Sequence, residues 1–330
     1  MIQTLPSHPT MQSTTCSSSS TPTIDYPPRQ QKQDHVYFDD FIVLKRITQA
    51  KFSVYLVTHP QTEQLYAMKV YPREQNKPNF FFHNEIRFSP LQHPNVVSML
   101  GHKDNRPFVR EGTCHRFSYI VMELAQYGDL FDLFMEQKHF FDEKLVRTYF
   151  HQLIAGLEYL HDNGVAHLDI KLENLLIGED YQLKIADFDL AYMEGDEKIH
   201  ALGSKCYRAP EILYKNCEEA KPADVYSAGI VLFMLQSQGM LPHLEEQDYE
   251  GVNLFELLHE NPEMFWMKHC EFHREKAELF SQEFRELFIG MTRKNPKERL
   301  TISQIKESSW YNGEIYCDDE LFEVMEEIML

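Results

Sequence analysis

The hydrophobic and polar positions of this chain follow two different periods. Short apolar runs that alternate with polar residues come first and end at turns, which is typical of antiparallel strands. They lie at residues 41–44, 54–57 and 65–68, and the polar stretch 59–64 suits a hairpin between the last two. After Gly128 the spacing of apolar residues becomes helical. The pattern therefore predicts a small β-rich part followed by a larger helical part.

The clearest helix is predicted after Asp142, which can cap its first turn. Asn163 and Gly164 can end this helix. Its apolar positions repeat about every 3.6 residues; they are Leu145, Val146, Tyr149, Phe150, Leu153, Ile154 and Leu157. In contrast, Pro90 predicts an early end for a helix that contains Glu85.

Composition divides the chain into three regions. Residues 1–36 are rich in Ser, Thr, Pro and Gln, and we expect them to form a disordered tail. Residues 37–311 have the periodicity of a folded domain, and residues 312–330 form an acidic tail. An apolar stripe in that tail could bind a partner, but we expect it to dock on the chain's own domain, because so short a helix is marginal alone. The stripe consists of Leu321, Val324, Met325 and Ile328.

The charge of the chain limits its partners. The net charge is −19, and residues 312–330 hold seven acidic residues and no basic one. An acidic surface argues against nucleic acid or an anionic membrane as the main partner. It is compatible with basic peptide substrates, although a solvated acidic surface is the simpler explanation. We expect a monomer.

The location of the protein is predicted from its cysteines and its apolar runs. The cysteines are scattered without a C-x-x-C pair, which favours reduced thiols; they are Cys16, Cys114, Cys206, Cys217, Cys270 and Cys317. No uncharged apolar run approaches the ~18 residues of a membrane span. The first ten residues lack the basic and apolar segments of a secretory signal. We therefore expect a cytoplasmic protein, with the nucleus as an alternative.

Candidate chemistry is concentrated in residues 167–174, HLDIKLEN, and in the later motif Asp187-Phe188-Asp189. Asp169 can orient and deprotonate an attacking hydroxyl, while Lys171 neutralises a moving phosphoryl group. Asn174 and Asp187 offer the hard oxygen ligands that Mg²⁺ prefers. Because uncompensated buried charge is costly, this set favours a nucleotide and metal site over a structural role.

These motifs resemble the catalytic loop and the magnesium motif of eukaryotic protein kinases, and further motifs follow the family's order over about residues 38–311. The resemblance implies an α+β, two-lobed protein kinase fold. The small lobe would cover about residues 37–125 and the larger lobe about residues 126–311. ATP and Mg²⁺ would bind in the cleft between the lobes.

The resemblance also implies roles for individual residues. Lys69 would grip the phosphates and pair with Glu85, and Met122 would be the gatekeeper. The ATP-binding set would be Lys69, Glu85, Ile47, Val54, Ala67, Glu123, Ala125, Asp129 and Leu176. Ser204 and Glu173 would contact the protein substrate. Braces of the larger lobe would be Glu211, Asp224 and Arg299.

The substrate class is implied by Lys171, because its place two residues after Asp169 resembles serine/threonine kinases and differs from tyrosine kinases. Glu173 would face basic residues of a peptide. Residues 284–310 most resemble the calcium/calmodulin- and AMP-regulated kinase group.

The nucleotide site departs from the family pattern in two places. The phosphate loop, residues 47–54, has no glycine: Thr48, Ala50 and Ser53 stand at the glycine positions. These residues are small, so we expect a weakened but not an abolished phosphate cradle. Asp189 replaces the glycine of the DFG motif, and its carboxylate could bind a metal ion or repel phosphate.

A third departure concerns regulation. Leu168 replaces the arginine that receives an activation-loop phosphate in many kinases. The segment 190–202 has only Tyr192 as a hydroxyl, and His200 stands where the phosphorylated threonine usually lies. We therefore expect that phosphorylation of this segment does not switch the protein.

Two functions remain open from the sequence. The complete set of kinase residues favours a protein serine/threonine kinase, while the glycine-free loop, Pro90 and Asp189 support a pseudokinase that binds nucleotide or acts as a scaffold. A zinc site at residues 269–273 is not favoured, because no second ligand pair lies at finger spacing.

Overall fold

The computed structural model describes residues 36–49, 51–73, 77–110, 113–136, 141–199, 203–213, 219–242, 253–272 and 278–329. These residues belong to one unit that begins at Val36. Most of the tail expected at residues 1–36 therefore lies outside the described residues, as do Ala50 and His200.

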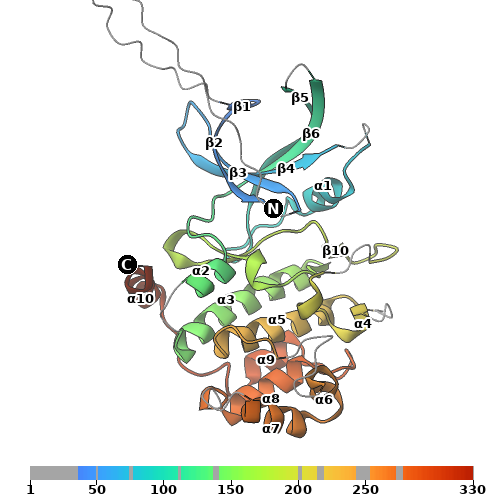
Figure 1. Ribbon diagram of the computed structural model, residues 1–330, viewed down its shortest axis with the longest axis vertical. Coiled ribbons are helices and arrows are strands. Elements are labelled where there is room, and N and C mark those ends of the chain that lie inside the picture. The colour runs from blue at the N-terminus through green and yellow to red at the C-terminus, as the bar shows by residue number, and fades with distance from the viewer. Residues whose placement is uncertain are drawn as a thin grey trace, which may run out of the picture. The chain divides into compact units, whose positions relative to one another are not determined.

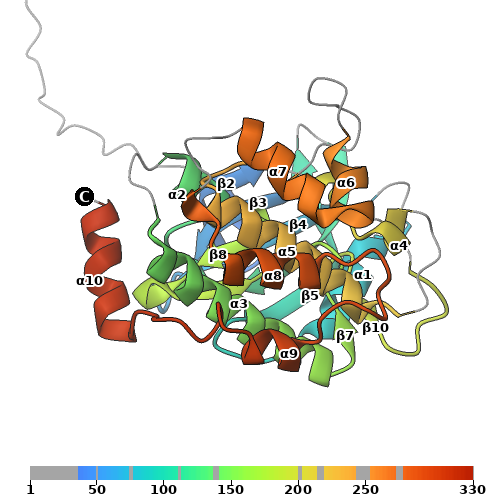
Figure 2. The same cartoon turned by 90° about the horizontal axis from the view of Figure 1, so that it is seen from below.

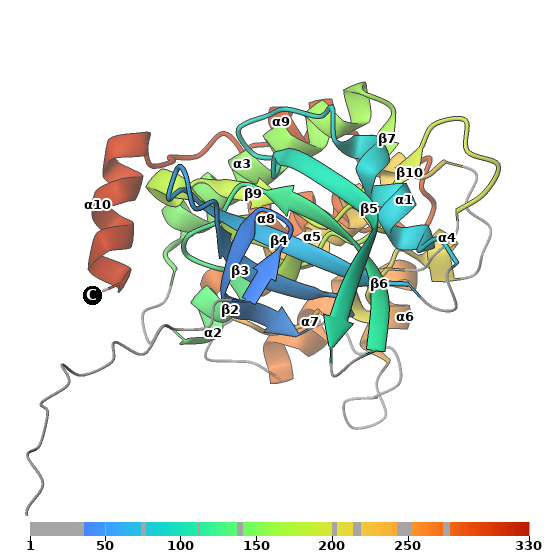
Figure 3. The same ribbon diagram turned by 90° about the horizontal axis from the view of Figure 1, so that it is seen from above.

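The small lobe is built on an antiparallel sheet with the strand order β1-β2-β3-β4-β6-β5 (Figures 1 and 3). The strands are β1 Val36–Phe38, β2 Phe41–Gln49, β3 Ser53–Thr58, β4 Leu65–Pro72, β5 Met99–Arg110 and β6 Thr113–Met122. Residues 59–64 join β3 to its antiparallel neighbour β4, which confirms the predicted hairpin. Because side chains alternate along a strand, Ala67 and Tyr71 of β4 pack on one side of the sheet and Met68 on the other.

One short helix, α1 (Phe80–Glu85), packs against this sheet. Asn79 caps it, since its side chain accepts a hydrogen bond of 3.2 Å from the backbone N–H of Phe82. The helix passes into a 3₁₀ turn at Ile86–Phe88 and stops before Pro90. The early end that Pro90 predicts is confirmed, and Glu85 lies at the last position of α1, fully buried.

The larger lobe is helical (Figures 1 and 2). Its helices are α2 Leu130–Glu136, α3 Glu143–Asp162, α4 Pro210–Leu213, α5 Lys221–Gln236, α6 Leu254–Glu260, α7 Pro262–Phe272, α8 Gln282–Met291 and α9 Ile302–Glu307. Asp142 caps α3 by accepting from the N–H of Leu145 at 2.7 Å, and Gly164 follows the helix with a φ of +74°. The predicted apolar positions of α3 are all buried. The expected α+β fold with two lobes is confirmed.

Two small two-stranded sheets present the loops of the candidate site on the larger lobe. Strand β8 (Leu175–Ile177) pairs with β9 (Leu183–Ile185), and β7 (Val165–Ala166) pairs with β10 (Tyr192–Met193). The loops at residues 167–174 and 186–191 run between these strands. The two small sheets therefore bring together the two segments that carry the candidate catalytic residues.

The acidic tail ends in helix α10 (Asp318–Met329), which docks on the larger lobe at the 3₁₀ turn Glu179–Tyr181 and near the start of α3 (Figures 1 and 2). Leu321 and Met325 are fully buried in the core of this lobe, as the apolar stripe predicts. The Tyr181 hydroxyl donates to Glu326 at 2.5 Å, and Lys144 pairs with Glu320 at 3.4 Å. The expected docking of the tail on its own domain is confirmed. No helix of the described ranges is long and apolar enough to cross a bilayer.

Truncation of the buried stripe should destabilise the domain. Leu321→Ala removes a fully buried side chain, so we expect the free energy of unfolding to fall by about 2–4 kcal/mol. Glu323→Ala on the exposed side of the same helix is the matched control, with a change within about 0.5 kcal/mol. Urea denaturation measures both, and equal stabilities of the two variants would contradict the docking.

Candidate active site

The start of the loop at residues 167–174 is held by one buried carboxylate of α5. Asp224 is fully buried and accepts hydrogen bonds from the backbone N–H groups of His167 at 2.8 Å and Leu168 at 2.7 Å. Leu168 has a positive φ of 63°, which is uncommon for a residue with a side chain. These bonds compensate the strained conformation and fix the direction in which the loop continues to Asp169.

Asp169 lies at the centre of a polar network. Its Oδ1 accepts from the N–H and hydroxyl of Ser204 at 2.7 and 2.9 Å, and its Oδ2 accepts from Lys171 Nζ at 2.9 Å. Lys171 Nζ also donates to the Ser204 hydroxyl at 2.9 Å. Burial raises the pKa of Asp169, but the hydrogen bond and charge of Lys171 and the N–H of Ser204 outweigh it and lower the pKa. Asp169 is therefore an ionised base fixed in orientation.

The approach of Ser204 to Asp169 depends on the glycine before it. A Cβ atom on Gly203 would lie 2.2 Å from the carbonyl oxygen of Leu168. Only glycine therefore lets these two backbones come this close. The sequence pair Gly203-Ser204, predicted from the resemblance, has a steric reason in the structure.

Lys69 on β4 lies between two carboxylates. Its Nζ is 2.6 Å from Glu85 Oε2 and 2.7 Å from Asp187 Oδ1. Burial lowers the pKa of Lys69, but the charges of Asp187 and Glu85 raise it well above its ordinary value, so the ammonium stays charged. Burial raises the pKa of Glu85, which Lys69 opposes, and Tyr71 donates a hydrogen bond to this carboxylate. The short contact to Lys69 favours the charged pair.

The two candidate magnesium ligands are oriented by their neighbours. The amide nitrogen of Asn174 donates to the carbonyl oxygen and to Oδ2 of Asp169 at 2.8 and 3.1 Å, which leaves the amide oxygen as the donor atom for a cation. Burial opposes ionisation of Asp187, but the charge and hydrogen bond of Lys69 lower its pKa to about 2. The Asp187 side chain is 35% exposed. These hard oxygen atoms fit Mg²⁺.

The apolar residues expected around the adenine come together. Val54 and Leu176 pack with Ala67 and the gatekeeper Met122, and Ala67 lies opposite Met122 in the sheet. Ile47 is different, because its side chain is 45% exposed. The structure therefore gathers most of the predicted apolar set beside Lys69.

The polar residues of this region lie after the sheet ends. The Glu123 side chain accepts from the N–H of Ser98 at 2.7 Å and pairs with Lys184 at 3.1 Å, so it braces the connection between the lobes; Ala125 follows in that connection. Asp129 accepts from the N–H of Asp132, and burial and the charges of Asp132 and Glu173 raise its pKa. Glu173 itself is exposed.

The loop between β2 and β3 makes contacts that the sequence did not predict. Lys51 Nζ lies 3.0 Å from Asp189 Oδ2. The Phe52 ring packs against Tyr71, with 4.5 Å between ring centroids, and lies near Phe81 at 5.7 Å. Asp189, which the sequence presents as a metal ligand or a repulsive charge, is thus an ion-pair partner of the loop.

Helix α1 and the 3₁₀ turn that follows it are tied to the segment after Asp187 by two further contacts that sequence reasoning missed. The Asn84 amide donates to the carbonyl oxygens of Asp189 and Ala191 at 3.1 and 2.8 Å. Arg87 forms two hydrogen bonds with Asp196, at 2.7 and 3.1 Å. A carboxylate of this segment therefore pairs with an arginine of the small lobe.

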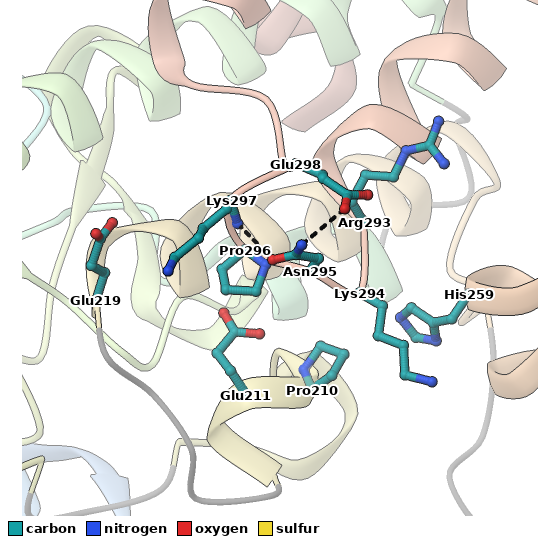
Figure 4. Close-up of a pocket in the computed structure, with 10 residues that line it drawn as sticks. All are labelled: Pro210, Glu211, Glu219, His259, Arg293, Lys294, Asn295, Pro296, Lys297 and Glu298. Carbon is teal, nitrogen blue, oxygen red and sulfur yellow. Dashed lines mark hydrogen bonds between the residues drawn. The ribbon is translucent and has the colours of Figure 1, made fainter.

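The braces of the larger lobe are also formed. Arg299 and Glu211, both buried, make hydrogen bonds of 2.6 and 2.9 Å. Glu211 also lines a pocket of about 560 Å³, shown in Figure 4, that includes none of the residues predicted to bind ATP, metal or substrate. At 269–273, His269 packs among the rings of Phe233, Phe265 and Phe280, and His273 lies outside the described residues.

Comparison with known proteins shows the family to which this chain is similar. A family model described as "Protein kinase domain" matches residues 43–311. Among relatives, "CBL-interacting protein kinase 26" of Oryza sativa subsp. japonica is 32% identical over 226 residues, 67% of this chain and 41% of that protein. "CBL-interacting protein kinase 12" of the same plant is 29% identical over 291 residues, 84% and 49%. "Probable serine/threonine-protein kinase MARK-C" of Dictyostelium discoideum is 33% identical over 224 residues, 67% and 26%. The matched region covers less than half of each relative's length.

The histidine in the pocket of Figure 4 should make stability depend on pH. Burial lowers the pKa of His259 to about 4, against an ordinary 6.5. Between these values the unfolded chain binds a proton that the folded chain does not, so stability should fall with falling pH in this window. In His259→Gln we expect this loss to shrink by about 2–3 kcal/mol. Denaturation at pH 7 and pH 4 measures it; the exposed His115→Gln is the control, and an equal loss in all three proteins would contradict the assignment.

Proposed function

We propose that this chain, which belongs to the protein kinase family, transfers the γ-phosphate of Mg-ATP to serine or threonine hydroxyls of protein substrates. The observation that carries the proposal is the continuity of its polar network. Lys69 bonds Glu85 and Asp187, and Asp169 bonds Lys171 and Ser204. The side-chain amide of Asn174 donates to Asp169. Its backbone carbonyl oxygen accepts from the backbone N–H of Ala186, just before Asp187. Every group that positions or neutralises a phosphoryl transfer has a partner in this network.

The residues of the chain would act by position and charge. Asp169, ionised and fixed by Ser204, would orient the substrate hydroxyl and take its proton on a carboxylate oxygen. Lys171 would then stabilise the charge of the transferred group from the same side. Bound Mg-ATP supplies the phosphoryl group and the metal charge that neutralises its oxygens. Asn174 and Asp187 are the residues that would hold the metal.

Nucleotide binding would use the remaining residues of the cleft. Lys69, kept in place by Glu85, would contact the phosphates. Val54, Ala67, Leu176 and the exposed Ile47 would cover the adenine, and the backbone of residues 123–125 would meet its polar edge, as the resemblance implies. Asp129 would lie near the ribose. The contacts described give no support to the alternative of a pseudokinase. Each catalytic residue, Asp169, Lys171 and Asn174, lies within the polar network.

Partners and location are further parts of the proposal. Glu173, exposed beside Asp129, supports a preference for basic residues in the substrate. The acidic net charge of −19 supports a function without nucleic acid. We also propose a monomer of the cytoplasm or nucleus, in which Cys114, Cys270 and Cys317 are free thiols.

The proposed base is tested by ³²P transfer from Mg-ATP to a basic protein. Asp169→Asn keeps the size of the side chain but removes the proton acceptor, so kcat should fall by about 10²–10⁴-fold. Binding of Mg-ATP should change little, which separates chemistry from folding. The exposed Glu298→Gln is a control that should keep full activity. Equal, background-level transfer by the wild type and Asp169→Asn would contradict the enzyme and favour a scaffold.

The role of Asp196 and the proposed independence from phosphorylation of residues 190–202 are tested by separate measurements. This carboxylate ties the segment to the 3₁₀ turn after α1 through Arg87. Because the pair is partly exposed, its loss should cost about 1 kcal/mol of interaction free energy. We expect Asp196→Ala to lower kcat/KM about fivefold, while the neighbouring exposed Glu197→Ala changes it little. A rise in wild-type activity of more than about tenfold on phosphorylation of this segment would contradict the proposal.

A further inference from the structure

A lysine of the glycine-free loop meets in space a residue that departs from the kinase pattern. Lys51 lies in the glycine-free loop between β2 and β3, and Asp189 replaces the glycine of the DFG motif. They are 138 positions apart in the chain, yet Lys51 Nζ lies 3.0 Å from Asp189 Oδ2. A positive charge of the loop therefore meets the negative charge that Asp189 adds to the metal motif.

The surroundings of this pair connect three elements. The Lys51 ammonium lies 3.2 Å from the centroid of the Phe81 ring of α1 and 5.2 Å from that of the Phe52 ring. A cation over an aromatic face gains additional attraction. Asp189 in turn keeps its backbone carbonyl bonded to Asn84 of α1. The contact thus holds the loop, α1 and the DFD motif together.

The two partners are unequally exposed, and this decides the electrostatic role of the pair. The Lys51 side chain is 48% exposed, whereas that of Asp189 is 5% exposed. A buried carboxylate without a partner is costly. Asp189 also lies beside the other carboxylates, since its backbone N–H bonds Asp187 Oδ1 at 3.4 Å. Lys69 makes its ion pairs with Glu85 and Asp187, and among the described residues Lys51 is the cation in direct contact with Asp189.

We propose that the Lys51–Asp189 ion pair is a clasp that supports binding of the ATP phosphates. Lys51 is a positioning residue: it cancels a carboxylate that would repel the phosphates, and it holds the tip of the loop down over the site. It thereby replaces part of the backbone cradle that glycines give in other kinases. This inference rests on the proposed function, because it takes Mg-ATP as the ligand of the cleft.

The opposite role, a latch that competes with nucleotide, is less consistent with the exposures. The pair leaves the Asp187 carboxylate 35% exposed, while Asp189 is covered. A clasp at Asp189 therefore keeps the proposed metal ligand accessible. A latch and a clasp predict opposite effects of removing Lys51, so affinity for nucleotide separates them.

The test is a double-mutant cycle on the affinity for Mg-AMP-PNP, a nucleotide that cannot be turned over, measured by titration calorimetry. Lys51→Met leaves Asp189 unpaired, and we expect binding about tenfold weaker. Asp189→Gly restores the family residue, and Lys51→Met in that background should bind within about threefold of Asp189→Gly alone. Lys51→Arg should keep the wild-type affinity. Lys45→Met, which removes an exposed lysine from β2, is the matched control and should change affinity less than twofold.

The outcomes of the cycle are decisive. Tighter binding by Lys51→Met, or a tenfold loss that persists in the Asp189→Gly background, overturns the clasp. Unfolding midpoints of the free proteins check folding, and if Lys51→Met is unfolded, Lys51→Gln takes its place. Wild-type binding that Lys69→Met abolishes but Lys51→Met does not alter overturns the clasp alone. Absence of nucleotide binding by the wild type overturns both the clasp and the proposed nucleotide site. Binding without ³²P transfer overturns only the proposed catalysis.

Discussion

The candidate site depends on the pairing of the buried Lys69 ammonium with two carboxylates. Lys69 belongs to the sheet, and its two carboxylate partners belong to α1 and to the motif at residues 187–189. A buried charge is tolerated only when its partners are present and well oriented. The position of α1 against the sheet and the orientation of Asp187 therefore follow from one requirement, which is to keep this cation paired.

Asp224 has the corresponding role in the larger lobe. Its carboxylate fixes the backbone of His167 and Leu168, and His167 Nε2 donates to the carbonyl oxygen of Ala186, just before Asp187. The catalytic loop and the metal motif are thus joined through His167 as well as through Asn174. Two buried charged side chains, one in each lobe, define the geometry in which the exposed groups can act.

The sequence predicted contacts that have a local or repeated signal. The alternation of β4, the cap of α3 and the stripe of α10 follow from short-range patterns, and the pairing of Lys69 with Glu85 followed from the family resemblance. Lys51–Asp189 and Arg87–Asp196 were missed, because ion pairs between distant segments leave no periodic pattern and each residue alone suits a solvated surface. Asp189 was considered only in relation to metal and phosphate. A search of the variable positions of the phosphate loop for a basic residue would have suggested its partner.

Helix α10 changes where the folded domain ends. The family match stops at residue 311, yet Leu321 and Met325 complete the core of the larger lobe. Tyr181, which donates to Glu326, also stacks on Tyr127 with 4.2 Å between ring centroids, next to the connection between the lobes. A fragment cut at the family boundary would expose an apolar groove to water and lose a support behind that connection. Such a fragment would be prone to self-association during expression, and recombinant forms of the domain should therefore retain the residues through Met329.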